Sequence, residues 1–124
     1  MRATDRRKFA RFTCQLHATY AVNGRGSAVR SLTRNIGPGG LSFFTATRIM
    51  VGTVLCLELQ LSGRRRPIRC TAQVIWSGPL ILEQRDSAIH AYETGVRLLD
   101  VAEDDQAALI GYASAQSLPP HELG

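Results

Sequence analysis

Strict alternation of apolar and polar residues along one stretch of chain constrains the fold more than any other feature. The apolar positions of that stretch are Phe12, Cys14, Leu16, Ala18, Tyr20 and Val22, and the polar positions between them begin with Thr13, Gln15, His17 and Thr19. Successive side chains of a β-strand point to opposite faces, so a period of two indicates a strand with one buried face. Residues 12–22 are therefore predicted to form a half-buried strand.

Five further segments carry strand patterns and are separated by short turn sequences. Asn23-Gly24-Arg25-Gly26 is a strong turn signal, and 62–67 is predicted to be a hairpin loop. A polar loop at 77–88 is expected before the last strand. The predicted strands are 27–34, 41–45, 54–61, 68–76 and 92–99, with Trp76 facing inward at the end of the fifth. Six short antiparallel strands of this kind predict a closed or nearly closed barrel.

The aromatic residues fall mainly at apolar, inward positions of these strands. We therefore expect them to belong to the core rather than to form a stacking surface; they include Tyr20, Phe43, Phe44 and Trp76.

The end of the chain has a helical pattern instead. Asp100 and Glu103 have the spacing of a capping box, and acidic residues in a first turn complement the helix dipole. We predict a helix over 101–115 that packs Leu109, Ile110 and Tyr112 on the sheet. The expected organisation is an arginine-rich arm at 1–11, a barrel with its helix at 12–117, and a tail at 118–124.

Charge is distributed unevenly along the chain. The net charge is +5, but residues 100–124 hold five acids and no Lys or Arg, so residues 1–99 carry 15 bases against five acids. All of these bases except Lys8 are arginine, whose planar fork binds phosphate or the guanine edge at two points. An anionic partner is therefore expected. The alternative explanation of the overall excess is a compositional bias towards arginine, but such a bias does not explain the clustering at the N-terminus.

Other classes of protein find less support. Cys14, Cys56 and Cys70 form no metal-binding spacing and are expected to be free thiols, and His17 and His90 have no ligand spacing either. No acid pair or nucleophile–base set stands out, so we expect no enzyme, no metal and no cofactor. The start of the chain lacks the apolar segment of a signal peptide, and no run spans a bilayer, so a cytoplasmic location is expected.

Two short motifs carry the functional information. An arginine-rich arm, Asp5-Arg6-Arg7-Lys8-Phe9-Ala10-Arg11, is followed about one hairpin later by Asn35-Ile36-Gly37-Pro38-Gly39-Gly40. Taken separately, the first is also typical of a solvated terminus and the second of an ordinary turn. Arg64-Arg65-Arg66 reads as an exposed hairpin tip, or alternatively as a partner or nucleic-acid contact.

In their order and spacing the two motifs resemble those of the PilZ domain, the bacterial receptor module for cyclic di-GMP. The family motif RxxxR is met by Arg7 and Arg11, and [D/N]xSxxG is met by Asn35 and Gly40, with Gly37 in place of the family serine. The resemblance continues through Gly52, Val74-Ile75-Trp76 and Gly95-Val96. It implies a six-stranded antiparallel PilZ-like β-barrel with one C-terminal α-helix.

The resemblance also implies roles for single residues. Arg7 and Arg11 would stack on guanine and donate to its O6/N7 edge and to phosphate, with Arg6 adding charge. Asn35 would offer its amide oxygen to the guanine N–H donors, and Gly40 would permit a backbone conformation that a Cβ forbids. Gly37 lacks the serine hydroxyl, and one lost hydrogen bond costs about 1–3 kcal/mol.

The function expected from these features is non-enzymatic reception of cyclic di-GMP. Binding would order the arm, and the signal would pass to a separate protein partner. The alternatives are a PilZ-like adaptor with weak or no ligand binding, acting in motility or pilus function, and a small basic barrel that binds single-stranded nucleic acid.

Overall fold

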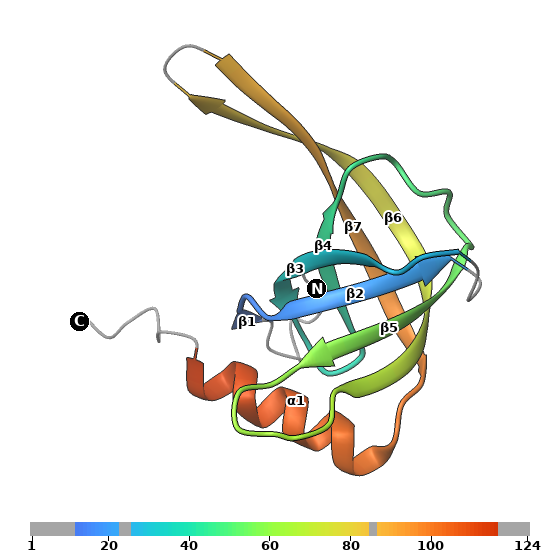
Figure 1. Cartoon of the computed structure of the whole chain (residues 1–124), viewed down its shortest axis with the longest axis vertical. Coiled ribbons are helices and arrows are strands. Elements are labelled where there is room, and N and C mark those ends of the chain that lie inside the picture. Colours follow the sequence, from blue (N-terminus) through green and yellow to red (C-terminus); the bar gives the residue numbers. More distant parts are fainter. Residues whose placement is uncertain (1–11, 23–25, 85–86, 117–124) are drawn as a thin grey trace, which may run out of the picture.

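The described part of the chain forms a closed β-barrel with one helix and one long projecting hairpin (Figure 1). The computed structural model describes residues 12–22, 26–84 and 87–116. Its elements are β1 (Phe12–Thr13), β2 (His17–Val22), β3 (Val29–Ile36), β4 (Gly40–Thr45), β5 (Val54–Gln60), β6 (Ile68–Gln84), β7 (Ser87–Asp100) and α1 (Glu103–Gln116).

Antiparallel pairing of six strands closes the barrel. The strand order is β1-β3-β2-β5-β6-β7-β4, and an additional pairing between β3 and β4 joins the two ends of the sheet. The two residues of β1 add to β3 beside this seam. The predicted six-stranded antiparallel barrel with a C-terminal helix is therefore confirmed.

The core fills the inside of the barrel with residues from every second position of its strands. On β5 and the segment after it, Leu55, Leu57, Leu59 and Leu61 are all buried, as the alternation predicted. The other strands supply Ala18, Tyr20, Ile36, Leu41, Phe43, Ile68, Cys70, Ala72, Val74 and Val96 to the same cluster. The rings of Tyr20 and Phe43 pack at a centroid distance of 5.0 Å.

The first predicted strand is interrupted at residues 14–16. Thr13 pairs with Asn35, whereas His17 pairs with Leu32, so three residues on one strand face two on the other, as in a β-bulge. The buried Thr33 hydroxyl bridges the break: it accepts from the Leu16 N–H (2.8 Å) and donates to the Cys14 carbonyl (2.7 Å). Alternation continues through the bulge, which is why the sequence pattern did not reveal it.

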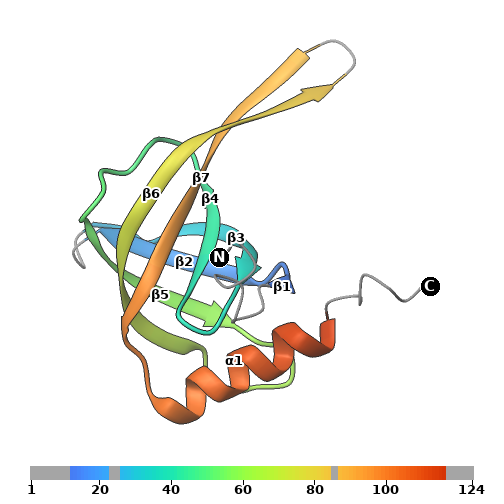
Figure 2. The same ribbon diagram turned by 180° about the vertical axis from the view of Figure 1, so that it is seen from behind.

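The prediction of a polar loop at 77–88 was wrong, because β6 and β7 continue through most of this segment. Pairing between β6 and β7 continues from Ser77↔Thr94 to Gln84↔Ser87, so the two strands form a hairpin that extends well beyond the barrel. Figure 2 shows this hairpin leaving the barrel at the end opposite α1. Sequence reasoning failed here because strand propensity in the segment Leu80-Ile81-Leu82 was outweighed by the turn residues Gly78 and Pro79 before it.

The predicted capping box also does not form. Asp100 is the last residue of β7 and pairs with Thr71. The first helical hydrogen bond runs from the Gln106 N–H to the Ala102 carbonyl (2.9 Å), which makes Ala102 the N-cap residue. The first turn is acidic, with Glu103, Asp104 and Asp105, and so complements the helix dipole. Leu109 and Ala113 are the buried residues of the helix, while Ile110 and Tyr112 pack at the margin of the core.

The Thr33 bridge leads to a stability prediction. Thr33→Val keeps the shape of the side chain but leaves the Leu16 N–H and the Cys14 carbonyl without partners, which should lower the free energy of unfolding by about 2–4 kcal/mol. Chemical denaturation measures this loss. Thr19→Val, at a half-buried position of β2, is the matched control and should change stability by less than about 0.5 kcal/mol. Equal effects would contradict the bridge.

Candidate functional site

The glycine-rich turn between β3 and β4 is held in place from three directions. The Gly37 N–H donates to the Gly40 carbonyl (2.8 Å) and closes the turn. The Leu98 N–H of β7 donates to the Gly39 carbonyl (3.0 Å). The Gln106 amide of α1 donates to the Pro38 carbonyl. Fixed in this way, the turn is a preorganised surface rather than a free loop.

Gly40 is required by a close approach of two backbones. A Cβ at this position would lie 2.3 Å from the Val96 carbonyl oxygen on β7. Among the described glycines, positive φ occurs at Gly26, Gly52 and Gly63. At Gly40, lack of space beside the Val96 carbonyl, rather than a positive φ, excludes a Cβ.

Beside the turn lies a pocket of about 290 Å³. The predicted site residues Asn35, Gly37 and Gly40 all line it, so the structure brings these three together. Its opposite wall comes from β6 and β7 and consists of Ile75, Trp76, Gly95 and Val96. The remaining predicted site residues, Arg6, Arg7 and Arg11, lie outside the described residues.

Trp76 is the pocket residue that sequence reasoning missed. It was expected in the core, but 38% of its surface is exposed. The register of β6 against β7 shifts between Val74 and Trp76, and this bulge turns Trp76 outward while Val74 stays buried. The indole lies over its cross-strand partner Gly95, where a Cβ would come within 2.3 Å of the ring. A glycine opposite a tryptophan in a predicted strand pair was the available signal.

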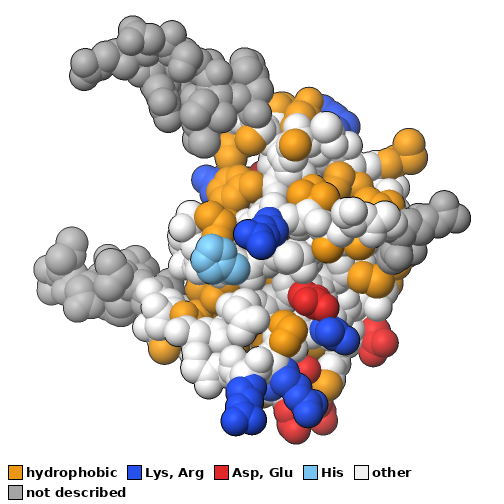
Figure 3. Space-filling model, viewed as in Figure 1, with side chains coloured by type: hydrophobic (Ala, Val, Ile, Leu, Met, Phe, Trp, Pro, Cys, Tyr) orange, Lys and Arg blue, Asp and Glu red, His pale blue; other side chains and the backbone are white. Residues whose placement is uncertain are grey.

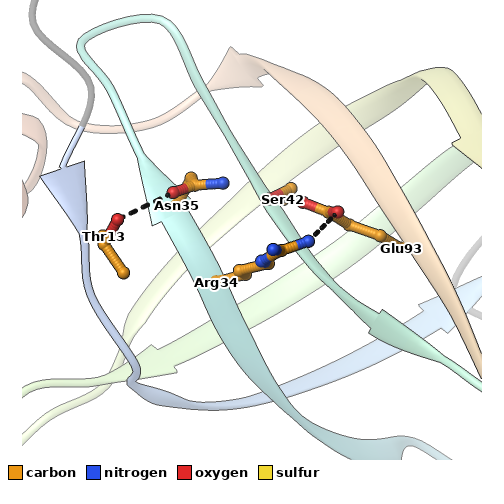
Figure 4. A network of polar contacts seen from close by, with 5 residues as sticks. All are labelled: Thr13, Arg34, Asn35, Ser42 and Glu93. Atoms are coloured by element: carbon orange, nitrogen blue, oxygen red, sulfur yellow. Dashed lines mark hydrogen bonds and ion pairs between the residues drawn. The ribbon is translucent and has the colours of Figure 1, made fainter. Parts of the chain in front are cut away.

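Polar contacts position Asn35 at the edge of the pocket. Figure 4 shows its side chain between β1 and β4, where its Oδ1 accepts from the Thr13 hydroxyl (3.3 Å). A carboxamide oxygen has two lone pairs, so Oδ1 keeps one for a second donor. Next to it, Glu93 accepts from the Arg34 guanidinium (2.6 Å) and from the buried Ser42 hydroxyl (2.8 Å). This network joins β3, β4 and β7 directly behind the pocket.

The first described residues place the root of the arm beside the pocket. Phe12 pairs with Ile36, and Thr13 pairs with Asn35. Arg11 is the residue before Phe12, and Arg7 stands five residues before it. Residues 12 and 13, which directly follow the predicted arm, therefore lie beside the glycine turn.

The second arginine cluster is partly neutralised by acids. Arg64 pairs with Asp105 (2.9 Å) and Arg69 with Glu58 (2.9 Å). In Figure 3 blue and red side chains accordingly lie next to each other at the lower end of the molecule. This arrangement favours a salt-bridged hairpin over a continuous basic surface.

The described residues offer little to other kinds of chemistry. They contain no group of three or more His, Cys, Asp or Glu placed to hold a metal ion, and no helix among them is long and apolar enough to cross a membrane. All three cysteines are free thiols, as expected. Burial, with smaller contributions from nearby Asp100 and Asp105, raises the pKa of Cys70 to about 11, and burial also raises the pKa of Cys14. At neutral pH these two thiols stay protonated and are poor nucleophiles.

Comparison with known proteins identifies one family. The model of the PilZ domain family matches residues 5–115. No curated protein matches this chain.

Three solved structures share the fold. The PilZ domain of YcgR from Escherichia coli, solved with c-di-GMP, has a TM-score of 0.71 and 17% identity, over 89% of this chain and 90% of that one. The Bacillus subtilis inhibitor of motility, MotI (DgrA), has a TM-score of 0.67 and 22% identity, over 88% of this chain and 50% of its own. MrkH, described as a c-di-GMP-dependent transcription regulatory factor, has a TM-score of 0.68 and 16% identity, over 84% and 48%. The chain thus spans about half the length of MotI and MrkH.

The contact between Trp76 and Gly95 can be tested without any ligand. Gly95→Ala should push the indole off the strand, shift the emission of this single tryptophan to longer wavelength, and lower the free energy of unfolding by about 1–3 kcal/mol. Gly78→Ala, on the same pair of strands, is the control because a Cβ there meets no atom within 4 Å. An unchanged emission maximum in Gly95→Ala would contradict the described position of the ring.

Proposed function

This chain belongs to the PilZ domain family, and on that premise we propose that it is a non-enzymatic receptor for cyclic di-GMP. One observation carries the proposal: Asn35, Gly37 and Gly40 line a single pocket, and the root of the arginine-rich arm lies beside it. The solved complex of the YcgR PilZ domain with c-di-GMP, which shares this fold, supports the choice of ligand.

Each part of the site suits one part of this ligand. The second lone pair of Asn35 Oδ1 accepts from the N–H donors of a guanine. Arg7 and Arg11, with Arg6 adding positive charge, donate to the guanine O6/N7 edge and to the two phosphates. Trp76 adds an exposed aromatic surface at the rim of the pocket, on which a purine can stack. The small residues of the turn let the ligand approach the backbone closely.

The proposed signal is a change in the arm. Arginines that pin the ligand against the barrel hold residues 1–11 in place and create a surface composed of arm, ligand and barrel rim. A separate protein partner reads this surface. Thr13, which follows the arm in sequence, already donates a hydrogen bond to Asn35 in the pocket. The proposed ordering of residues 1–11 therefore starts from a residue that is fixed beside the ligand site.

Gly37 favours a second candidate, a PilZ adaptor that binds the ligand weakly and acts through protein contacts. The serine of the family motif is missing at this position, and with it one hydroxyl that faces the pocket. A lost hydrogen bond of about 1–3 kcal/mol corresponds to an affinity about ten- to a hundredfold lower. Measured affinity separates the two candidates.

The single tryptophan makes binding directly observable. Titration with cyclic di-GMP should change Trp76 emission in a saturable way, and calorimetry should give the same affinity. Arg7→Ala and Arg11→Ala should each weaken binding at least about tenfold, because each removes charge-assisted hydrogen bonds worth roughly 1.5–3 kcal/mol. Thermal stability should be nearly unchanged.

Arg65→Ala, in the loop between β5 and β6 and outside the pocket lining, is the matched control and should bind like the wild type. An equal loss from Arg65→Ala would move the site to that hairpin. Tighter binding of a short oligonucleotide than of cyclic di-GMP at physiological salt would replace the receptor by a nucleic-acid-binding protein.

Position 37 supplies an opposite, gain-of-affinity prediction. Its glycine is not among those with positive φ, so the φ of this position is open to serine. Gly37→Ser restores a hydroxyl in the pocket and reduces the freedom of the unliganded turn, which should raise affinity about tenfold. Calorimetry on the folded variant measures this. A normally folded Gly37→Ser protein with unchanged affinity would show that position 37 does not contact the ligand.

A further inference from the structure

The β6–β7 hairpin leaves the barrel as a ribbon of only two strands. β5 pairs with β6 as far as Gln73, and β4 pairs with β7 only from Tyr92 to Arg97. The loop before β5 reaches β6 once more at Ser77, through the Ile49 N–H (3.1 Å). Beyond these points, residues 80–84 of β6 and 87–91 of β7 pair with each other and with no other described strand, while Gly78 and Pro79 of β6 pair only with Glu93 and Tyr92 of β7. Figures 1 and 2 show this part of the ribbon standing clear of the barrel.

The ribbon therefore has two open edges, and an open edge presents unpaired backbone N–H and C=O groups. Natural proteins block such edges with proline, charge or a covering element. A two-stranded ribbon is also only marginally stable in water, whereas a third strand makes a sheet stable. The ribbon thus gains stability from a strand added at either edge that is not blocked.

The two edges differ in how well they are protected. The β6 segment contains Pro79, which has no N–H to offer, and Glu83. The β7 segment, Ser87-Ala88-Ile89-His90-Ala91, contains no proline, Lys, Arg, Asp or Glu. The sequence therefore blocks one edge of the ribbon and leaves the other open.

We infer that the open β7 edge pairs with the same edge of a second copy of this chain. Two identical strands that run antiparallel satisfy twofold symmetry, since each residue meets its counterpart from the other copy. With the axis at Ile89, Ser87 lies opposite Ala91, and Ala88 lies opposite His90. No two like charges face each other across this pairing when histidine is neutral. The uncharged character of all five positions selects a copy of itself rather than a charged partner strand.

Pairing in this way makes one four-stranded sheet in the order β6-β7-β7-β6. The antiparallel arrangement sends the two barrels to opposite ends of that sheet, so both glycine turns and both arms stay accessible. Five residues from each copy form a small interface, which predicts a weak, concentration-dependent dimer.

Analytical ultracentrifugation over a wide concentration series, at about pH 8 where histidine is neutral, tests the inference. The wild type should pass from monomer to dimer as its concentration rises. Ile89→Lys places two lysines next to the twofold axis and should weaken dimerisation about tenfold or more. Leu82→Lys is the matched control, because position 82 is the cross-strand partner of 89 and belongs to the blocked strand.

Hydrogen exchange gives an independent reading. The amides of residues 87–91 should gain protection at high protein concentration, and those of 78–84 should not. A protein that remains monomeric throughout the series, or one in which Ile89→Lys and Leu82→Lys weaken dimerisation equally, overturns the inference. Unchanged thermal unfolding of the barrel in both variants excludes misfolding as the cause.

Discussion

The contact between the backbones of β4 and β7 at Gly40 is the constraint on which the rest of this structure depends. β4 closes the barrel because it pairs with β3 on one side and β7 on the other. At Gly40 the Val96 carbonyl comes so close that no Cβ fits between the strands. The turn that precedes Gly40 must therefore lie against β7, where Leu98 holds it. The close contact at Gly40 therefore determines both the closure of the barrel and the position of the pocket.

Local sequence was enough to predict those parts of the fold and the site that lie close together in the chain. Alternation identified the buried leucines of β5, and one six-residue motif contained Asn35, Gly37 and Gly40, which the structure brings together in the pocket. Register between distant strands was not predictable in the same way. An extra residue in one strand shifts its pairing with the neighbouring strand but leaves the alternation of apolar and polar residues along its own strand intact. For this reason the interruption at residues 14–16 could not be seen in the sequence.

Trp76 illustrates the same limit at the site itself. It stands forty-one residues from Asn35 in sequence, and its place at the pocket depends on a bulge in β6. A tryptophan that continued the alternation of Ile68, Cys70, Ala72 and Val74 would face the core. The sequence did contain one signal, Gly95, because a glycine inside a strand often marks the close approach of another group. That glycine acquires meaning only when the register places it beneath the indole.

The bulge at Ile75 also determines the register of the β6–β7 ribbon. Before it, β6 and β7 pair in one register, through Ala72↔Leu98 and Val74↔Val96; after it, a second register runs without interruption from Trp76↔Gly95 to Gln84↔Ser87. A slip of one residue reverses the two faces of every strand position that follows it. The residue that turns Trp76 towards the pocket therefore also decides which face each residue of the ribbon takes. The bulge at Ile75 therefore affects both the pocket and the ribbon, although they lie in different parts of the molecule.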